Sequence, residues 1–362
     1  MGPDLPAIEP DIAHATTLPA WFYHDPASHA RVVERVFARS WQLVADLGQV
    51  RAPGQTLPLT LLPGSLDEPI LLTRDASDAL HCLSNVCTHR GMLVCEAGGV
   101  EGALRCRYHG RRFALDGRFL SMPEFDGVTG FPSPADDLPR LPLEGWGPFL
   151  FTGLGPATPF ADFVAPLTER IRGLPLESCV FDPARSRDYL VKANWALYCD
   201  NYLEGFHIPY IHAALSGALD YGRYRTELFE GGSLQVGVAS GDEDVLDLPP
   251  NSPDHGTRIA AYYFWLFPNL MVNVYPWGLS LNVVKPLAVD RTRVSFLSYV
   301  WDPARLDTGA GDGLDRVERE DEVVVEAVQR GVRSRRYTHG RYSVTRETGV
   351  HHFHRLLGRW LG

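Results

Sequence analysis

Two pairs of cysteine and histidine residues constrain the fold of this chain more than any other feature of its sequence. Cys87 and His89 form the first pair, and Cys106 and His109 form the second after sixteen intervening residues. Structural zinc sites usually pair cysteine with cysteine, two to four residues apart. One cysteine and one histidine in each of two turns instead suit a [2Fe–2S] cluster, in which one iron takes two thiolates and the other two imidazoles. A zinc site remains the alternative.

The residues around these pairs predict a small β domain. Between Trp41 and Phe151 the chain reads as short apolar segments separated by turns. Gly91 and Gly110 follow the two ligand pairs, and we expect them to let the backbone approach the cluster closely.

The two pairs resemble the Rieske motif. Respiratory Rieske proteins carry an additional cysteine in each loop, where this chain has Met92 and Tyr108. The resemblance is therefore to the Rieske domains of oxygenases and their ferredoxins. Where many oxygenases read CPYHGW, this chain reads CRYHGR, so Arg107 and Arg111 are expected to shift the cluster potential or to shape an electron-donor surface.

A second group of potential ligands lies in the stretch CDNYLEGFHIPYIH, residues 199–212. If the stretch is largely helical, Glu204 and His207 share one face. His207 and His212 are five residues apart, so an ideal helix would separate them. Pro209 disturbs the helix, and a local bulge there would bring the two imidazoles together. Two imidazoles and one carboxylate form the facial triad of non-haem Fe(II) oxygenases; the carboxylate is either Glu204 or a residue from elsewhere.

A late helix offers Asp321 as that carboxylate. Asp321 occupies one position of a stripe with helical spacing, and a buried acid needs a partner such as a metal. The predicted stripe consists of Leu314, Val317, Asp321, Val324 and Val328. The alternative, that Asp321 lies at a solvated edge, stays open because of its acidic neighbours Glu318, Glu320 and Glu322.

The stretch from Asp200 to His212 also resembles the iron motif of Rieske non-haem iron oxygenase α subunits, the superfamily of aromatic-ring-hydroxylating dioxygenases and choline, carnitine and glycine betaine monooxygenases. The resemblance implies iron on His207, His212 and Asp321, and a functional asparagine at Asn201. It covers nearly the whole chain.

The resemblance gives Glu204 a role other than ligation. It implies a bridging carboxylate that hydrogen-bonds His207 of its own subunit and His109 of a neighbouring subunit, and so carries electrons between them. It therefore implies a homotrimer. Most ring-hydroxylating members have Asp at this position, whereas members that attack carnitine or glycine betaine resemble this chain in having Glu. The C-terminal run also looks like the end of choline monooxygenases.

The expected fold class is α+β. An N-terminal helical segment (residues 1–40) packs on the catalytic domain, an all-β Rieske [2Fe–2S] domain spans residues 41–155, and a catalytic mononuclear iron domain spans residues 156–362. The resemblance implies a helix-grip (START/Bet v1-like) catalytic domain with an antiparallel sheet around a cavity.

Aromatic residues around Pro268 suggest a substrate pocket, because an aromatic cage holds a quaternary ammonium well. The candidates are Tyr263, Trp265, Phe267 and Tyr275. An ordinary core of aromatic strands is the alternative. Near the C-terminus, we expect His351, His352 and His354 at the surface or at a helix cap.

The net charge of −10 and the lack of a basic run argue against nucleic-acid and membrane partners. Without a basic n-region the N-terminus is no signal peptide, so a cytoplasmic location is expected. No dinucleotide-binding motif is evident, so NAD(P)H should act only through a separate reductase or ferredoxin.

The predicted activity is that of an oxidoreductase acting on paired donors: it uses O2 to hydroxylate or N-demethylate a small organic substrate, with a preference for quaternary or N-methylated amines. The alternatives are aromatic-ring cis-dihydroxylation and, without catalysis, a Rieske electron carrier.

Overall fold

The computed structural model describes residues 5–362 and divides the chain into two units. Residues 38–157 form one unit, here called the β unit. Residues 1–37 and 158–362 together form the other, here called the mixed unit. Residues 1–4 of the expected N-terminal segment lie outside the described residues.

The β unit consists of antiparallel strands in three sheets, with orders β1-β11-β10, β5-β2-β3-β4-β9 and β6-β7-β8. The strands are β1 (Gln42–Asp46), β2 (Gln55–Leu61), β3 (Glu68–Arg74), β4 (Leu80–Ser84), β5 (Gly99–Val100), β6 (Leu104–Arg105), β7 (Arg112–Phe113), β8 (Phe119–Ser121), β9 (Arg140–Leu141), β10 (Leu143–Trp146) and β11 (Phe149–Thr152).

Strand β3 separates two cores of the β unit because its side chains alternate between two faces. Ile70 and Leu72 belong to one apolar cluster. Leu71, between them, belongs to a second cluster that includes Cys87 and Cys106. The two cysteine loops are therefore fixed against the central strand of the larger sheet.

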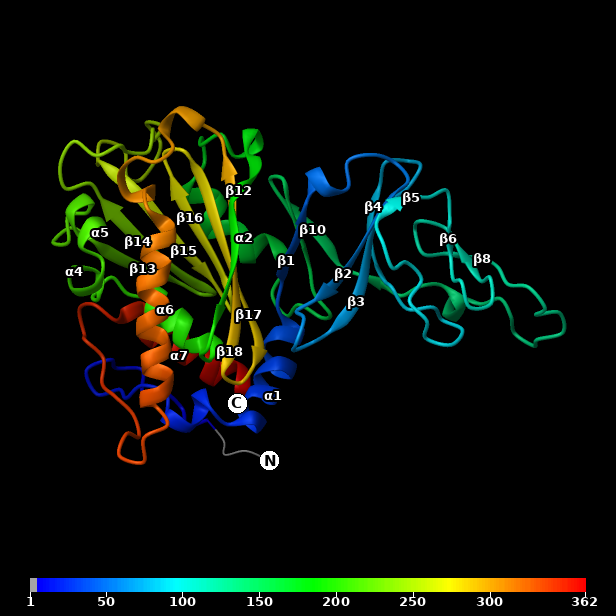
Figure 1. Ribbon diagram of the computed structural model, residues 1–362, viewed down its shortest axis with the longest axis horizontal. Helices are drawn as coiled ribbons and strands as arrows, with labels where there is room; N and C mark the ends of the chain where they lie inside the picture. The colour runs from blue at the N-terminus through cyan, green and yellow to red at the C-terminus, as the bar shows by residue number, and fades with distance from the viewer. Residues whose placement is uncertain (1–4) are drawn as a thin grey trace. The chain divides into compact units, whose positions relative to one another are not determined.

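The mixed unit is built on a seven-stranded antiparallel sheet of order β12-β18-β17-β16-β15-β14-β13 (Figure 1). Strands β13 to β18 form a continuous meander, and β12 pairs with β18 to complete the far edge. The strands are β12 (Val180–Val191), β13 (Arg225–Phe229), β14 (Gly232–Val238), β15 (Ile259–Leu266), β16 (Leu270–Tyr275), β17 (Gly278–Ala288) and β18 (Arg291–Val300).

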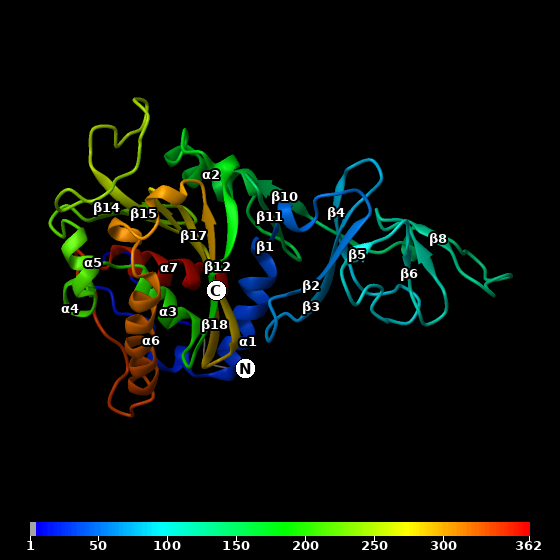
Figure 2. The ribbon, with the colours of Figure 1, turned by 45° about the horizontal axis from the view of Figure 1, so that its top comes forward.

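Helices cover this sheet, with α3 in contact with α6, α7 and β17, and α7 packed on β13 and β14 (Figure 2). The α+β class and the antiparallel catalytic sheet are thus confirmed. The helices are α1 (Pro26–Arg35), α2 (Phe160–Arg170), α3 (Trp195–Tyr202), α4 (Ile208–Ile211), α5 (Ala213–Ala218), α6 (Leu314–Gly331) and α7 (Thr348–Leu361). Within residues 5–362, none of them is both long and apolar enough to cross a membrane.

The predicted surface position is wrong for two of the three C-terminal histidines, and the third, His352, is half-buried. They sit on α7, where His351 and His354 are buried. His354 makes hydrogen bonds of 2.8 Å to Asp200 and 2.6 Å to Tyr342. A histidine with such partners is satisfied inside a core, and one of the two, Asp200, is distant in sequence.

Candidate metal centres and active site

The two cysteine–histidine loops of the β unit are built alike. The backbone amide of Cys87 donates to the carbonyl of Met92 (2.8 Å), five residues on. The amide of Cys106 donates to the carbonyl of Arg111 (2.9 Å), again five residues on. The same turn therefore presents one ligand pair from each loop.

Gly91 and Gly110 close these turns, and each amide donates to the carbonyl of the cysteine four residues earlier (both 3.0 Å). Their φ angles are +74° and +77°, which side chains disfavour. A Cβ on Gly91 would meet nothing within 4 Å. The backbone conformation by itself therefore requires glycine at this position.

The four ligand candidates separate by depth. The side chains of Cys87 and Cys106 are buried, at 3% and 2% exposure. His89 is half-buried and His109 is exposed, and their ring centroids lie 4.7 Å apart. Two inner thiols and two outer imidazoles suit a cluster with one iron on each pair.

The two arginines of this motif occupy different environments. Arg111 is buried, forms a 2.7 Å ion pair with Asp136 and lies over the ring of Phe119 (4.9 Å). Arg107 is 82% exposed along its side chain. Of these two arginines, therefore, only Arg107 is accessible to an electron donor, whereas Arg111 stabilises the second cysteine–histidine loop.

In the mixed unit, the chain between α3 and α4 carries the histidines. Helix α3 ends at Tyr202, before Glu204, and α4 begins at Ile208. The predicted helical bulge at Pro209 is therefore wrong. Proline is tolerated in the first turn of a helix, and here Pro209 stands at the start of α4. The interruption lies earlier, at residues 203–207.

Gly205 allows this interruption. A Cβ at Gly205 would lie 2.6 Å from the ring of Tyr224. The turn therefore passes directly over a tyrosine ring, at a distance that only glycine permits.

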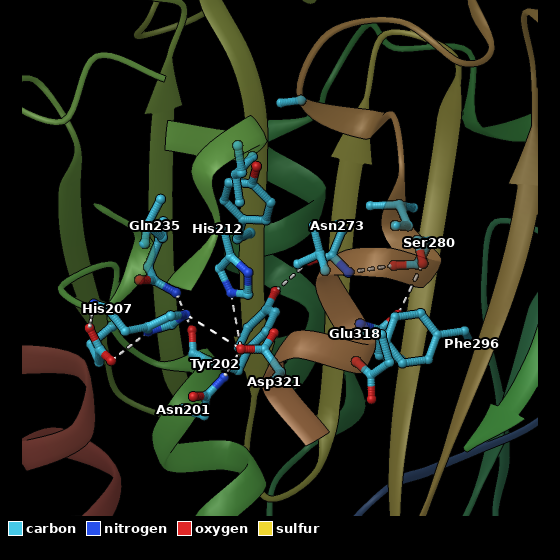
Figure 3. Close-up of a pocket in the computed structure, with 18 of the residues that line it drawn as sticks. Asn201, Tyr202, His207, His212, Gln235, Asn273, Ser280, Phe296, Glu318 and Asp321 are labelled. Carbon is cyan, nitrogen blue, oxygen red and sulfur yellow. Dashed lines mark hydrogen bonds and ion pairs between the residues drawn. The ribbon is translucent and has the colours of Figure 1, made fainter. Parts of the chain in front are cut away.

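The two histidines meet Asp321, which lies on α6 (Figure 3). The Nε2 atoms of His207 and His212 lie 3.6 Å and 3.0 Å from Oδ1 of Asp321. One ligand atom from each of the three residues falls within 4.8 Å of the others. This donor set suits a facial triad and leaves room for other ligands.

Two further carboxylates orient the imidazoles. Glu204 lies 2.6 Å from Nδ1 of His207, and Glu320 lies 2.7 Å from Nδ1 of His212. A proton on each Nδ1 leaves both Nε2 lone pairs free for a metal. The residues present therefore fit a mononuclear iron, and Glu204 is placed beside the ligands rather than among them.

Asn201 holds the third member of the group. Its side-chain amide donates to Oδ1 of Asp321 (2.7 Å). Burial lowers the pKa of His212, but hydrogen bonds to Asp321 and Glu320 outweigh burial and raise it. The two acidic side chains beside His212 therefore favour a positive charge at this place.

The buried face of α6 differs from the predicted stripe. Val328 is 42% exposed, so its assignment to the buried face is wrong. Glu318 and Gln329 are buried instead. Polar partners explain the difference. The hydroxyl of Tyr198 donates to Glu318 (2.6 Å), and the backbone amide of Asn194 donates to the side-chain oxygen of Gln329 (2.7 Å).

A cavity with about 770 Å³ of empty space, including its mouth, adjoins the three residues. It is lined by Tyr198, Asn201, Tyr202, Glu204, His207, Ile208, His212, Leu215, Tyr224, Gln235, Tyr263, Asn273, Tyr275, Ser280, Asn282, Phe296, Ala310, Leu314, Val317, Glu318 and Asp321. The structure thus brings together the predicted iron residues and two of the four predicted pocket aromatics, Tyr263 and Tyr275.

The other two predicted pocket aromatics do not line this cavity. Trp265 lies further along β15, where its ring packs against Phe353 of α7 (5.0 Å). Phe267 contacts Trp360, also on α7 (5.1 Å). The helix covers that end of the strand, so these two rings form core.

Sequence reasoning missed Tyr202, Tyr224, Glu318 and Glu320 as residues of the site. Tyr202 follows Asn201 directly, so its place in the motif was a usable signal. Nothing local marked Tyr224, which reaches the cavity through the tertiary fold.

Comparison with known proteins decides the family. Residues 40–132 match the Rieske [2Fe–2S] domain, and residues 176–362 match the ring hydroxylating alpha subunit (catalytic domain). The chain belongs to the ring-hydroxylating alpha-subunit family.

Relatives of known activity cover nearly the whole chain. Choline monooxygenase of Arabidopsis thaliana is 31% identical over 96% of this chain and 83% of its own length. The carnitine monooxygenase oxygenase subunit of Escherichia coli (strain K12) is 30% identical over 95% of this chain and 94% of its own. The solved quaternary ammonium Rieske monooxygenase CntA shares the fold, with a TM-score of 0.80, 23% identity and coverage of 99% and 100% of the two chains.

This member of the family is an oxygen-incorporating oxidoreductase, with a [2Fe–2S] cluster and a non-haem iron as cofactors and O2 as co-substrate.

Metal analysis provides the first test of the assigned sites. The purified chain should contain about three irons, two in the cluster and one mononuclear. Mass spectrometry for iron, with quantified EPR of the reduced cluster, measures both pools. A value of two irons, all in the cluster, would mean that the mixed unit does not hold iron.

Proposed function

We propose that this oxygenase hydroxylates or N-demethylates a small quaternary or N-methylated amine. The observation that carries the proposal is a set of tyrosines lining the cavity beside the iron residues. The rings of Tyr224 and Tyr275 lie 6.4 Å and 6.1 Å from that of Tyr263. Aromatic faces attract quaternary ammonium groups. The choline and carnitine monooxygenases similar to this chain act, by name, on such compounds.

The predicted alternatives are not favoured. A pure electron carrier has no need of a second metal group or of a cavity beside it. Ring cis-dihydroxylation needs an apolar pocket for an uncharged ring. This lining contains Gln235 Oε1 and the hydroxyl of Tyr263, which are buried without hydrogen-bond partners among the described residues and suit a polar substrate.

We assign the [2Fe–2S] cluster to two cysteines and two histidines of the β unit, and the iron to His207, His212 and Asp321. The cluster residues are Cys87, His89, Cys106 and His109. When bound, the iron supplies the centre at which O2 is activated with electrons from the cluster.

The protein side chains perform the remaining tasks. Glu204 and Glu320 fix the protons on the Nδ1 atoms of the iron histidines, and Asn201 holds Asp321. The tyrosines hold the substrate cation and exclude water from the reacting carbon.

Glu204 has a second task in this proposal, as the bridge by which an electron leaves the cluster for the iron. Two observations support this role. Glu204 lies 2.6 Å from Nδ1 of His207, and inter-subunit electron transfer is described for a quaternary ammonium Rieske monooxygenase of the same fold. The cluster histidine, His109, would come from an adjacent subunit of a homotrimer. A separate reductase or ferredoxin would supply the electrons.

Oxygen uptake with NADH and a reductase, measured over a panel of compounds, tests the proposed substrate class. The panel contains choline, carnitine, glycine betaine and simple aromatics, with product identification by mass spectrometry. We expect at least one quaternary amine to stimulate uptake and to appear as a hydroxylated or demethylated product. Conversion of only the aromatics, to diols, would contradict the proposal.

A further inference from the structure

Glu318 is a buried carboxylate in the cavity wall that the assigned metal chemistry does not use. It lies on α6 three residues before Asp321, about 4.5 Å along the helix axis, and Figure 3 shows both residues in the pocket. Its side chain is 3% exposed. Tyr198 donates to its Oε2 (2.6 Å), whereas its Oε1 has no hydrogen-bond partner among the described residues.

Among the described residues, no cationic side chain forms an ion pair with this carboxylate. Among the described residues, the cavity lining includes neither lysine nor arginine. The adjacent Arg319 lies 3.4 Å from Glu322 and covers the ring of Tyr189. Burial raises the pKa of Glu318 well above its ordinary value. A buried acid without a cation is costly for the fold, so its retention calls for a ligand that offsets the cost.

We propose that Glu318 is the counter-anion of a positively charged substrate, and that the pocket therefore prefers a cationic amine with an uncharged tail over a zwitterion with a carboxylate. This inference rests on the proposed function and specifies its substrate class. A quaternary nitrogen between the tyrosine faces and Oε1 of Glu318 would receive both cation–π and ionic stabilisation.

The remaining lining suits an uncharged tail. Gln235 uses its amide nitrogen to donate to the carbonyl of Tyr202 (2.6 Å), and its Oε1 is buried without a partner among the described residues. The hydroxyl of Tyr263 is in the same situation. A substrate hydroxyl could donate to the former and accept from the latter.

A substrate carboxylate would find the hydroxyl of Tyr263 as a donor but no cationic side chain in the described lining. It would enter a wall that carries Glu204, Glu318 and Asp321. The positive charge of the iron does not reverse this, because Asp321 would bind the iron directly and Glu204 and Glu320 hydrogen-bond its histidines. Repulsion between like charges in a buried site would therefore weaken the binding of a zwitterion.

Calorimetric titration of the holoenzyme with three compounds tests the inference. They are choline, its neutral analogue in which a carbon replaces the nitrogen, and L-carnitine. The wild type should bind choline at least about tenfold more tightly than either of the others. Glu318→Gln should weaken choline binding by about the same factor while leaving the neutral analogue unchanged, because the shape of the pocket is kept.

A matched variant separates recognition from structure. Glu322→Gln removes an acid from the same helix outside the cavity lining, and it should retain the preference for choline over its neutral analogue. If Glu318→Gln is poorly folded, Glu318→Asp replaces it and should also retain the preference, since the charge stays.

The outcomes are distinguishable. Wild-type enzyme that binds L-carnitine or the neutral analogue as tightly as choline overturns the inference and leaves the amine oxygenase proposal standing. An unchanged preference in folded Glu318→Gln does the same. Wild-type enzyme that binds none of the three compounds overturns the proposed substrate class, and the inference falls with it.

Discussion

Asp321→Ala should lose the mononuclear iron and keep the [2Fe–2S] cluster. The side chain supplies the carboxylate oxygen on which both histidine Nε2 atoms converge. Two imidazoles alone bind iron weakly, because the carboxylate supplies the negative charge and the third ligand of the facial triad. The cluster ligands belong to a different unit of the chain, so the substitution should not reach them.

The measurements are iron content and EPR. Iron should fall from about three to about two per chain, with an unchanged signal from the reduced cluster. Loss of a residue that hydrogen-bonds a metal ligand typically lowers activity by about 10–100-fold. Loss of the ligand Asp321 itself should lower turnover by more than this. Asp315→Ala is the matched control, because Asp315 lies on α6 outside the cavity lining, where it accepts a hydrogen bond from Tyr189 and forms an ion pair with Arg187.

Two results would contradict this assignment. Retention of the third iron by Asp321→Ala would mean that another carboxylate is the ligand. Loss of the cluster signal together with the iron would mean that Asp321 supports the fold of the whole chain rather than one metal.

Local patterns predicted which candidate ligands lie close together, because each candidate pair lies within one short segment. Cys87 and His89 share a loop, as do Cys106 and His109, and His207 and His212 are separated by a single short helix. Spacing alone conveys such an arrangement. Spacing does not predict why the turn forms. The helix was expected to be distorted at Pro209, whereas in the structure it is interrupted by the turn at Gly205.

Long-range packing explains most of what the sequence did not predict. Helical periodicity made Asp321 a candidate, and the structure places it beside His207 and His212. The same periodicity suggested a solvated surface at Glu318 and a buried position at Val328. Both assignments are wrong: Glu318 is buried because Tyr198, more than a hundred residues earlier, donates to it, and Gln329 rather than Val328 is buried because it accepts from the backbone amide of Asn194. Periodicity uses the sequence of one helix only, whereas the burial of a polar side chain depends on hydrogen-bond partners from other elements.

The aromatic residues divide for the same reason. Tyr263 and Trp265 are two residues apart on β15 and share a face of the sheet. One lines the cavity and the other lies under α7. Composition predicts an aromatic sheet, and only the placement of the covering helix decides which rings a substrate could meet.

Glu204→Gln should keep both metals while turnover falls by about 100-fold. Glutamine has nearly the same shape, and its carbonyl oxygen can still accept the proton on Nδ1 of His207. What it lacks is the negative charge and the second acceptor oxygen, and a bridge needs both because it accepts from an imidazole at each end. Iron content and cluster EPR should therefore match those of the wild type.

Glu320→Gln is the control that gives this prediction its meaning, because Glu320 holds His212 as Glu204 holds His207, at 2.7 Å and 2.6 Å. The decisive measurement starts from chemically reduced enzyme, mixed rapidly with O2 and substrate, and follows reoxidation of the cluster by its visible absorbance. Glu204→Gln should reduce normally and reoxidise slowly, whereas Glu320→Gln should reoxidise much faster. Equal rates in the two variants would make Glu204 a positioning residue for His207, and the electron would then take another path to the iron.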